Sequence, residues 1–405
     1  MHEWPARLIA ERIHDREITA REVVEHHLGR IESRPELNAF ITVNADGARR
    51  SAARIDESLS KGPLAGVPLA VKDAFDTEGI RTTYGSVIFA EHIPTRTAPA
   101  VQALLDAGAV LVGKANLDEF ARGVMTRNPF FGACLNPRDP SRTPAGSSGG
   151  NAAALAAGFV ALGLATDAGG SIRAPSAACA TAGFKPSFGS VSSEGSFGLA
   201  APFDHVGPMA RTIDDCVLAM TVLADMPEPP PRLEGLSIGL VGPIDDLVRI
   251  ESLAASVETT SIPSFEHLIP LHLVEFARTH RRLFAEQGSL YSEPCARMLE
   301  RGLAISDAEQ QRLRGELAVW RERCRQELPF DVLVGPTLSR EPPLLDDVET
   351  LELLLEVSWL TRPFNMLGWP AATCRDGVMF AGRSDALVLG AALAWEKGLP
   401  PPRTA

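Results

Sequence analysis

The segment from Gly146 to Gly189 most constrains how this chain can fold, because it is rich in glycine, alanine and serine and has few long side chains. Small side chains let a backbone approach a second backbone or a ligand closely, as a site built from main-chain N–H groups requires. Two clusters stand out: AGSSGG begins at Ala145, and TDAGGSIR begins at Thr166, directly after an apolar run. The segment therefore predicts a closely packed site at the end of a buried stretch of chain.

The residues on either side of this segment predict an α/β fold. Apolar residues have helical spacing after Thr19, in a surface helix after Ala45, and in APAVQALLDAG. GVPLAVKDAF and AVLVGK are typical of buried strands, and their alternation with helices is typical of an α/β sheet. After a Pro-rich stretch, SIGLVG predicts another strand, and the sequence to about Leu328 is rich in helix. FDVLVGPT, SWLTRPFNMLGWPAATC and GVMFAG resemble strands and turns that return to the sheet.

Charge and cysteine usage exclude several classes of function. The net charge is −12 and the basic residues are scattered, so we expect no direct binding of nucleic acid. Six cysteines form no C-x-x-C pair, which favours reduced thiols in a cytosol over disulfides or zinc. The N-terminus lacks the apolar core of a signal peptide, and the apolar runs are too short to span a membrane. These features predict a cytoplasmic protein with no membrane association.

Two short motifs have alternative interpretations. GAVLVGKA fits the start of a phosphate-binding loop, but Ala115 occupies the position of the magnesium-binding Ser or Thr. We therefore expect a buried strand on which Lys114 faces solvent. GSSGG fits the nucleophile elbow of α/β hydrolases, with Ser148 as nucleophile, and a flexible Gly/Ser turn is the alternative. No histidine downstream has an informative context, and no H-E-x-x-H spacing indicates a metal site.

A combination of lysine and serines fits amide hydrolysis without histidine. The reaction needs a nucleophile, a base, a proton donor for the leaving amine and fixed N–H groups for the oxyanion. Ser171 follows two glycines, so consecutive N–H groups can converge on one oxygen near it. Lys72 lies near the end of a strand expected to be buried, where a lowered pKa would make it a base. A serine of the AGSSGG loop can relay the proton between them.

These residues resemble the amidase signature family. The resemblance rests on VKDAFDT around Lys72, GKANLDEFARG, NPRDPSRTPAGSSGGNAAALAAG, LATDAGGSIRAPSAACATAGFKPSFGSVS and TRPFNMLGWPA. It covers most of residues 15–225 and returns near 331–395. It implies an α/β amidase-signature fold, whose large mixed and twisted β-sheet core has helices on both faces. It also implies a single amidase domain, 1–405, with these parts: a signature core at about 60–225, a Pro-rich connector at 225–235 and a shortened, divergent part at 236–405.

The resemblance implies a Ser-cisSer-Lys triad with no metal or organic cofactor. Ser171 would be the nucleophile that accepts the acyl group, and Lys72 would be the ultimate base. Ser147, after a cis peptide bond from Gly146, would pass the proton between them. The oxyanion hole would use the backbone N–H groups of Ala168, Gly169, Gly170 and Ser171.

The resemblance also implies roles for neighbouring side chains. We expect Arg173 to pair with Asp167 inside the core rather than to bind substrate. Ser148 would support its loop by hydrogen bonds, and Asn365 would order a late loop near the site. The candidate substrate-binding residues are Met125, Thr126, Arg127 and Asn365. Arg127, or Arg362 of TRPFN, is also a candidate for binding a carboxylate-bearing amide, with a solvated surface arginine as the alternative.

Within the family, NLDEFARG and the serine loop are similar to one component of the glutamyl/aspartyl-tRNA amidotransferases, the component that carries the amidase fold, and to carboxybiuret and allophanate hydrolases. The first hypothesis is a hydrolase that converts a small carboxamide to carboxylate and ammonia through an acyl-serine. The alternatives are a transamidase subunit that acts on aminoacyl-tRNA with a partner subunit, and a non-catalytic family member. A homodimer is compatible with each of them.

The chain departs from the family pattern in two ways. Its serine loop begins AGSSGG instead of the commoner GGSSGG, and we expect Ala145 to be tolerated on an ordinary backbone. The region after SIGLVG lacks a normal strand–helix–strand unit, and the shortened C-terminal part predicts a more open pocket.

Overall fold

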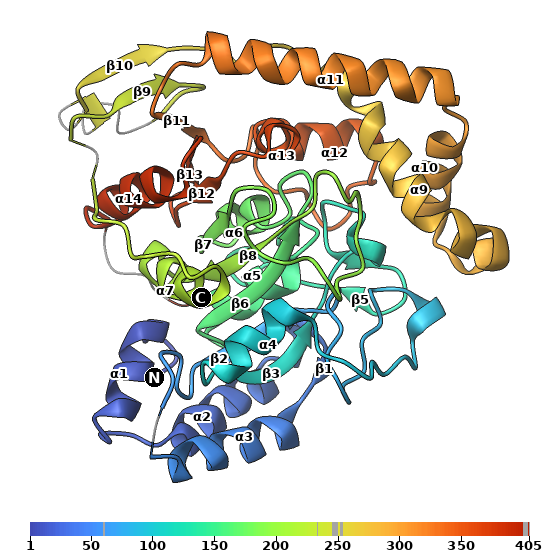
Figure 1. The fold of residues 1–405 in the computed structure, drawn as a ribbon. Coiled ribbons are helices and arrows are strands. Elements are labelled where there is room, and N and C mark those ends of the chain that lie inside the picture. The colour runs from blue at the N-terminus through green and yellow to red at the C-terminus, as the bar shows by residue number, and fades with distance from the viewer. Residues whose placement is uncertain (60, 233, 245–249, 252–253, 400–403, 405) are drawn as a thin grey trace.

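The computed structural model describes residues 1–59, 61–232, 234–244, 250–251, 254–399 and 404 (Figure 1). Within these residues, one mixed sheet of 11 strands runs through the molecule. Its strands, in chain order, are β1 (Phe40–Val43), β2 (Pro68–Lys72), β3 (Val110–Ala115), β6 (Leu162–Asp167), β7 (Ala182–Lys185), β8 (His205–Ala210), β9 (Ser237–Leu240), β10 (Ser256–Thr259), β11 (Val332–Pro336), β12 (Ala371–Thr373) and β13 (Val378–Gly382). A separate short ribbon pairs β4 (Arg127–Asn128) with β5 (Gly132–Ala133).

The order of the strands brings the two Gly/Ser-rich clusters toward the middle of the sheet. The order is β1-β3-β2-β6-β8-β7-β12-β13-β11-β9-β10. β2 lies between β3 and β6 and is parallel to both, so Lys72 and Asp167 both lie at the C-terminal ends of neighbouring strands. β8 pairs antiparallel with β6, which makes the sheet mixed. Strands from both the early and the late parts of the chain thus belong to one sheet.

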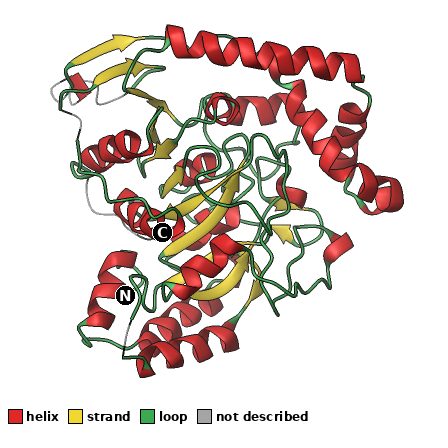
Figure 2. Ribbon diagram, viewed as in Figure 1, coloured by secondary structure: helices red, strands yellow, loops and turns green. Residues whose placement is uncertain are grey.

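Helices flank this sheet (Figure 2). They are α1 (Ala6–His14), α2 (Ala20–Ser33), α3 (Ala45–Glu57), α4 (Pro99–Asp106), α5 (Gly149–Ala156), α6 (Arg173–Ala178), α7 (Ile213–Leu223), α9 (Pro270–Gln287), α10 (Glu293–Leu303), α11 (Asp307–Glu327), α12 (Leu351–Ser358), α13 (Arg362–Leu367) and α14 (Asp385–Glu396). The predicted helix after Thr19 is confirmed as α2, which begins at a capping box between Thr19 and Glu22. Within the described ranges, no helix combines the length and the hydropathy that crossing a membrane requires.

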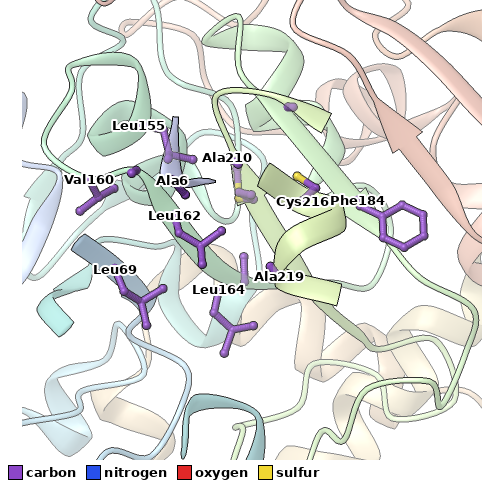
Figure 3. Packing of buried hydrophobic residues seen from close by; sticks show 14 of the residues in the cluster. Ala6, Leu69, Leu155, Val160, Leu162, Leu164, Phe184, Ala210, Cys216 and Ala219 are labelled. Atoms are coloured by element: carbon purple, nitrogen blue, oxygen red, sulfur yellow. The ribbon is translucent and has the colours of Figure 1, made fainter. Parts of the chain in front are cut away.

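The abundance of small residues has a direct packing explanation. Every residue of α5 is buried, and a Cβ on Gly150 would lie 2.4 Å from the backbone nitrogen of Asn116. Figure 3 shows the core beside this helix, where Leu69, Leu162 and Leu164 project from β2 and β6. Burying each such leucine contributes about 1.5–3 kcal/mol. Small residues bring the helix close to the strands, and the leucines fill the remaining space.

Two sequence-based expectations about the fold were wrong. Lys114 is fully buried and does not face solvent, because its amine lies 3.2 Å from the carboxylate of Asp73 and donates to the Phe75 carbonyl oxygen at 2.7 Å. SWLTRPFNML is largely helical, in α12 and α13, and strand structure starts only at Ala371. The expectation that no normal strand–helix–strand unit follows SIGLVG concerns a connection that lies partly outside the described residues. Within the described residues, β10 pairs in parallel with β9.

Candidate active site

Lys72 is the last residue of β2 and has no exposed surface. Its Nζ lies 2.8 Å from Ser147 Oγ and 2.9 Å from Thr166 Oγ1, and donates to both. In the described part of the chain, no carboxylate oxygen lies within 4.0 Å of this amine. Burial lowers the pKa of Lys72 to about 7, although the more distant Asp118 and Asp167 oppose the shift. A large fraction of the amine is therefore neutral near pH 7.

Ser147 lies in the loop that leads into α5, and it is fully buried. The peptide bond between Gly146 and Ser147 is cis, as the family resemblance implies. The expectation of an ordinary backbone at Ala145 was wrong: this residue has a φ of 56°, in the left-handed region, where a side chain costs about 1–2 kcal/mol. Ser148 Oγ donates weakly to the Thr166 carbonyl oxygen at 3.4 Å, which ties the loop to β6.

Ser171 follows β6 and is partly exposed, at a cavity of about 30 Å³ that Gly146 also lines. That volume is enough for about two water molecules. Among the hydrogen bonds of the described residues, none joins Ser147 to Ser171. The proton path between these two hydroxyls is therefore part of the proposal below.

The backbone before Ser171 departs from the expected oxyanion hole at one residue. The Gly170 N–H donates to Asp167 Oδ1 at 2.7 Å, so it is directed at that carboxylate and not at the cavity. Gly170 has a φ of 135°, and a Cβ there would lie 2.2 Å from Thr361 Oγ1. In the described structure, the N–H groups of Ala168, Gly169 and Ser171 have no acceptor. They are the candidate oxyanion donors.

The predicted pairing of Arg173 with Asp167 is confirmed. Arg173 Nε and Nη2 each donate to the carboxylate at 3.0 Å, and both side chains are fully buried. Burial would raise the pKa of Asp167, but Arg173 and Lys185 outweigh it and hold the pKa below its ordinary value. Asn365 donates to Asp167 Oδ1 at 2.8 Å and accepts from Arg173 Nη2 at 2.6 Å. This network connects α13 to the loop that carries Ser171.

The four candidate substrate-binding residues lie elsewhere than expected. None of them is among the described residues that line the cavity at Ser171. Met125 is buried in an apolar cluster, and Thr126 Oγ1 holds the serine loop by donating to the Ala145 carbonyl oxygen at 2.8 Å. Arg127 is exposed and donates to the Leu345 carbonyl oxygen at 2.6 Å. Asn365 belongs to the Asp167 network.

Two residues of the cavity wall, His272 and Arg122, were not identified from the sequence, and Arg362 was named only as one of two candidates for binding a carboxylate. His272 of α9 donates from Nε2 to the Ala168 carbonyl oxygen, 3.1 Å away, and its ring stacks on Phe203 at 4.4 Å. We write Nε2 as the protonated nitrogen because its partner is a carbonyl oxygen. Arg122 and Arg362 line the same cavity. His272 lies far beyond the catalytic segment, in a weakly matched region where no local motif marks it.

All six cysteines are free and buried. Within the described residues, no group of three or more His, Cys, Asp or Glu side chains is arranged to hold a metal ion.

Comparison with known proteins shows which family this chain belongs to. The Amidase family model matches residues 22–233, more than half of the chain, so the chain belongs to the amidase signature family. A curated relative, the GatA-type component of the glutamyl-tRNA(Gln) amidotransferase of Carboxydothermus hydrogenoformans, is 39% identical over 302 residues. That match covers 66% of this chain and 62% of the relative, so the chain spans less than two thirds of the relative's length.

Solved structures match nearly the whole chain. A crystal structure described as an amidase has a TM-score of 0.88 and 29% identity, covering 98% of this chain and 100% of its own. A structure from work on a vestigial complex and the origins of an s-triazine catabolic enzyme has a TM-score of 0.89 and 27% identity, covering 99% and 100%. The α/β amidase-signature fold is thus confirmed, and the structural relatives include amidases.

Proposed function

We propose that this protein is an amidohydrolase that converts a small carboxamide to a carboxylate and ammonia through an acyl-serine. The observation that carries the proposal is the buried amine of Lys72, which contacts Ser147 Oγ at 2.8 Å. In the described structure this amine has no carboxylate partner within salt-bridge distance. Because burial lowers its pKa to about 7, it can accept a proton at neutral pH.

The first half of the reaction forms the acyl-enzyme. Ser147 gives its proton to Lys72 and takes the proton of Ser171, whose Oγ attacks the carbonyl carbon of the amide. The carbonyl oxygen gains the electron pair of the C=O π bond and accepts hydrogen bonds from the N–H groups of Ala168 and Gly169. When this intermediate collapses, the C–N bond breaks, and the proton held by Lys72 returns through Ser147 to the leaving nitrogen. Ammonia leaves and the acyl group stays on Ser171.

The second half of the reaction uses water as the nucleophile. Water gives one proton through the same relay to Lys72 and attacks the acyl carbon, and the bond to Ser171 Oγ then breaks. The stored proton returns to Ser171, and the product leaves as a carboxylic acid that ionises in solution. No step needs a redox partner, because each bond breaks and forms by electron pairs.

An ammonia-release assay across simple amides tests the proposal. We expect Ser171→Ala and Ser147→Ala each to lower kcat by about 10³-fold or more. Ser141→Ala, at an exposed serine upstream, is the matched control and should leave kcat unchanged. Hydroxylamine should convert the acyl-enzyme to a hydroxamate, and mass spectrometry of acid-quenched enzyme should place the acyl group on Ser171. An active Ser171→Ala enzyme would end the proposal.

A second candidate is a transamidase subunit that acts on aminoacyl-tRNA with a partner subunit. The name of the 39% identical relative favours it. Capture of a second subunit, together with glutamine-dependent amidation of glutamyl-tRNA, would support this candidate over the hydrolase. A non-catalytic role is the least favoured, because Lys72, Ser147 and Ser171 are all retained. A homodimer and a cytoplasmic location remain predictions from the sequence.

A further inference from the structure

We infer that Arg122 and Arg362 form an anion-binding subsite that selects amides carrying a second, carboxylate group. The inference rests on the proposed hydrolase function and adds the substrate class. Both arginines line the cavity at Ser171. Such a substrate would be a short monoamide of a dicarboxylic acid, and the products would be the dicarboxylate and ammonia.

Arg362 is a buried cation without an acidic partner among the described residues. Its exposed fraction is 6%, and a Cβ on Gly169 would lie only 3.3 Å from its Cζ, so the guanidinium packs against the loop before Ser171. Nη2 donates to Ser358 Oγ at 2.7 Å. Nε is buried and has no hydrogen-bond partner within the described chain. A buried guanidinium normally has a carboxylate or equivalent acceptors, because leaving it unpaired is costly.

Asp167, the acid whose charge acts on Arg362, already accepts hydrogen bonds from several other groups. Asp167 accepts from Arg173 through both oxygens, and also from Asn365 and from the N–H groups of Gly170 and Ile172. It influences Arg362 only through its charge, and no hydrogen bond of the described structure joins the two. Asp167 is therefore the counter-ion of Arg173, and the charge of Arg362 is not neutralised by it.

Arg122 adds a second positive charge on the same cavity. It follows a short 3-10 turn, Glu119–Ala121, and is half-buried. In the described chain it forms no ion pair within 4.0 Å; Glu349 and Asp118 act on it through longer-range charge, and Glu349 accepts from the Val124 N–H at 2.9 Å. Burial, followed by the charge of Arg122, lowers the pKa of Arg362 to about 9. Two neighbouring cations repel each other, and an anion bound between them would relieve that repulsion.

The geometry favours a carboxylate at a short distance from the reacting carbonyl. Gly169, which contacts the Arg362 guanidinium, is also a candidate oxyanion donor, so the anion and the scissile amide would lie close together. Both arginines and Gly169 line the same cavity, so one short substrate can contact the guanidinium groups and the oxyanion donors together. Guanidinium groups bind carboxylates through two parallel hydrogen bonds, which also fixes the orientation of the substrate.

The test compares two series of amides of equal chain length. One series is anionic, from oxamate through succinamate to glutaramate, and the other consists of neutral alkyl carboxamides such as butyramide. We expect the wild-type enzyme to prefer at least one anionic amide over its neutral counterpart. Arg362→Gln should lower kcat/KM for that amide by about 10- to 100-fold and leave the neutral series within a few-fold. Arg122→Gln is the second variant, in case the first does not fold, and Arg323→Gln on the exposed face of α11 is the matched control.

A binding measurement separates this inference from the proposed function. In the Ser171→Ala protein, calorimetry should detect binding of the matching dicarboxylate, and either arginine substitution should remove it. If amides are hydrolysed through Ser171 but no carboxylate is preferred or bound, the subsite is refuted and the hydrolase stands. If no amide is hydrolysed but dicarboxylates bind through the arginines, the subsite stands and the hydrolase fails. An equal loss on both series in Arg362→Gln would mean that this arginine stabilises the oxyanion, and would overturn the inference.

Discussion

Replacing Lys72 with methionine should abolish activity and yet stabilise the fold near neutral pH. A pKa lowered by burial from 10.5 to about 7 corresponds to about 4–5 kcal/mol of unfavourable free energy for carrying the proton in the folded protein. Methionine removes this cost but also removes hydrogen bonds to Ser147 and Thr166, worth about 1 kcal/mol each. We therefore expect a net gain of about 2 kcal/mol in the free energy of unfolding at pH 7.

The gain should depend on pH in a defined direction. Between about pH 7 and pH 10 the unfolded lysine is protonated while the buried amine is neutral, so the unfolded state binds more protons. Wild-type stability therefore rises with pH in this window, by up to about 1.4 kcal/mol per pH unit from this residue. The methionine variant lacks that contribution, so its advantage should shrink as pH rises and disappear by about pH 10.

Denaturant unfolding of both proteins across this pH range provides the measurement, because other titrating groups cancel in the difference. Lys114→Met is the matched control, since Lys114 is equally buried on the adjacent strand β3 but contacts the carboxylate of Asp73 at 3.2 Å. Removing Lys114 leaves a buried carboxylate unpaired and should destabilise the fold by about 3–5 kcal/mol. A Lys72→Met protein that is less stable at pH 7, with an unchanged pH difference, would refute the reasoning.

Three other predictions follow from the same network. The kcat/KM of the wild-type enzyme should fall about tenfold per pH unit below about pH 7, as Lys72 becomes protonated, and a flat profile down to pH 5 would contradict this. Gly170→Ala places a Cβ 2.2 Å from a threonine hydroxyl and should lower both stability and kcat, whereas Gly189→Ala, at a φ of 82° with nothing within 4 Å, should cost only about 1 kcal/mol and leave kcat unchanged. Asp167→Asn leaves Arg173 without its counter-ion and should lower the unfolding free energy by about 3–5 kcal/mol in urea; a loss below about 1 kcal/mol would show that the pair matters little.

Local patterns predicted the parts of the fold whose stabilising contacts are near in sequence. The helix after Thr19 and the buried runs of β2 and β3 appear where the sequence indicated them. The helical segment α13 was missed because Pro, Gly and aromatic residues in SWLTRPFNMLGWP weaken a helical pattern. The carbonyl of Thr361 and the side chain of Asn365 anchor this segment to Arg173, about 190 positions earlier. No single-sequence pattern contains that contact.

Lys114 and Lys72 show the same difference between what a local sequence pattern predicts and what contacts between distant segments determine. Both lie in apolar strands, and the structure pairs Lys114 with Asp73 but gives Lys72 no carboxylate partner among the described residues. That difference depends on which side chains the sheet order brings together, and it supports Lys72, which the family resemblance already indicated, as the candidate base. The place of Arg362 in the cavity wall depends likewise on α13 packing beside the loop before Ser171.

The amino-acid sequence by itself therefore determined the family resemblance, the residue types of the triad and the need for small residues around them, because these follow from local motifs and side-chain size. Only the tertiary structure decided which N–H groups remain free near Ser171, that Arg127 lies outside the cavity and that Arg362 lies in its wall. The physical reason is that hydrogen-bond satisfaction and charge pairing are properties of contacts between distant segments, and such contacts exist only once the sheet has assembled.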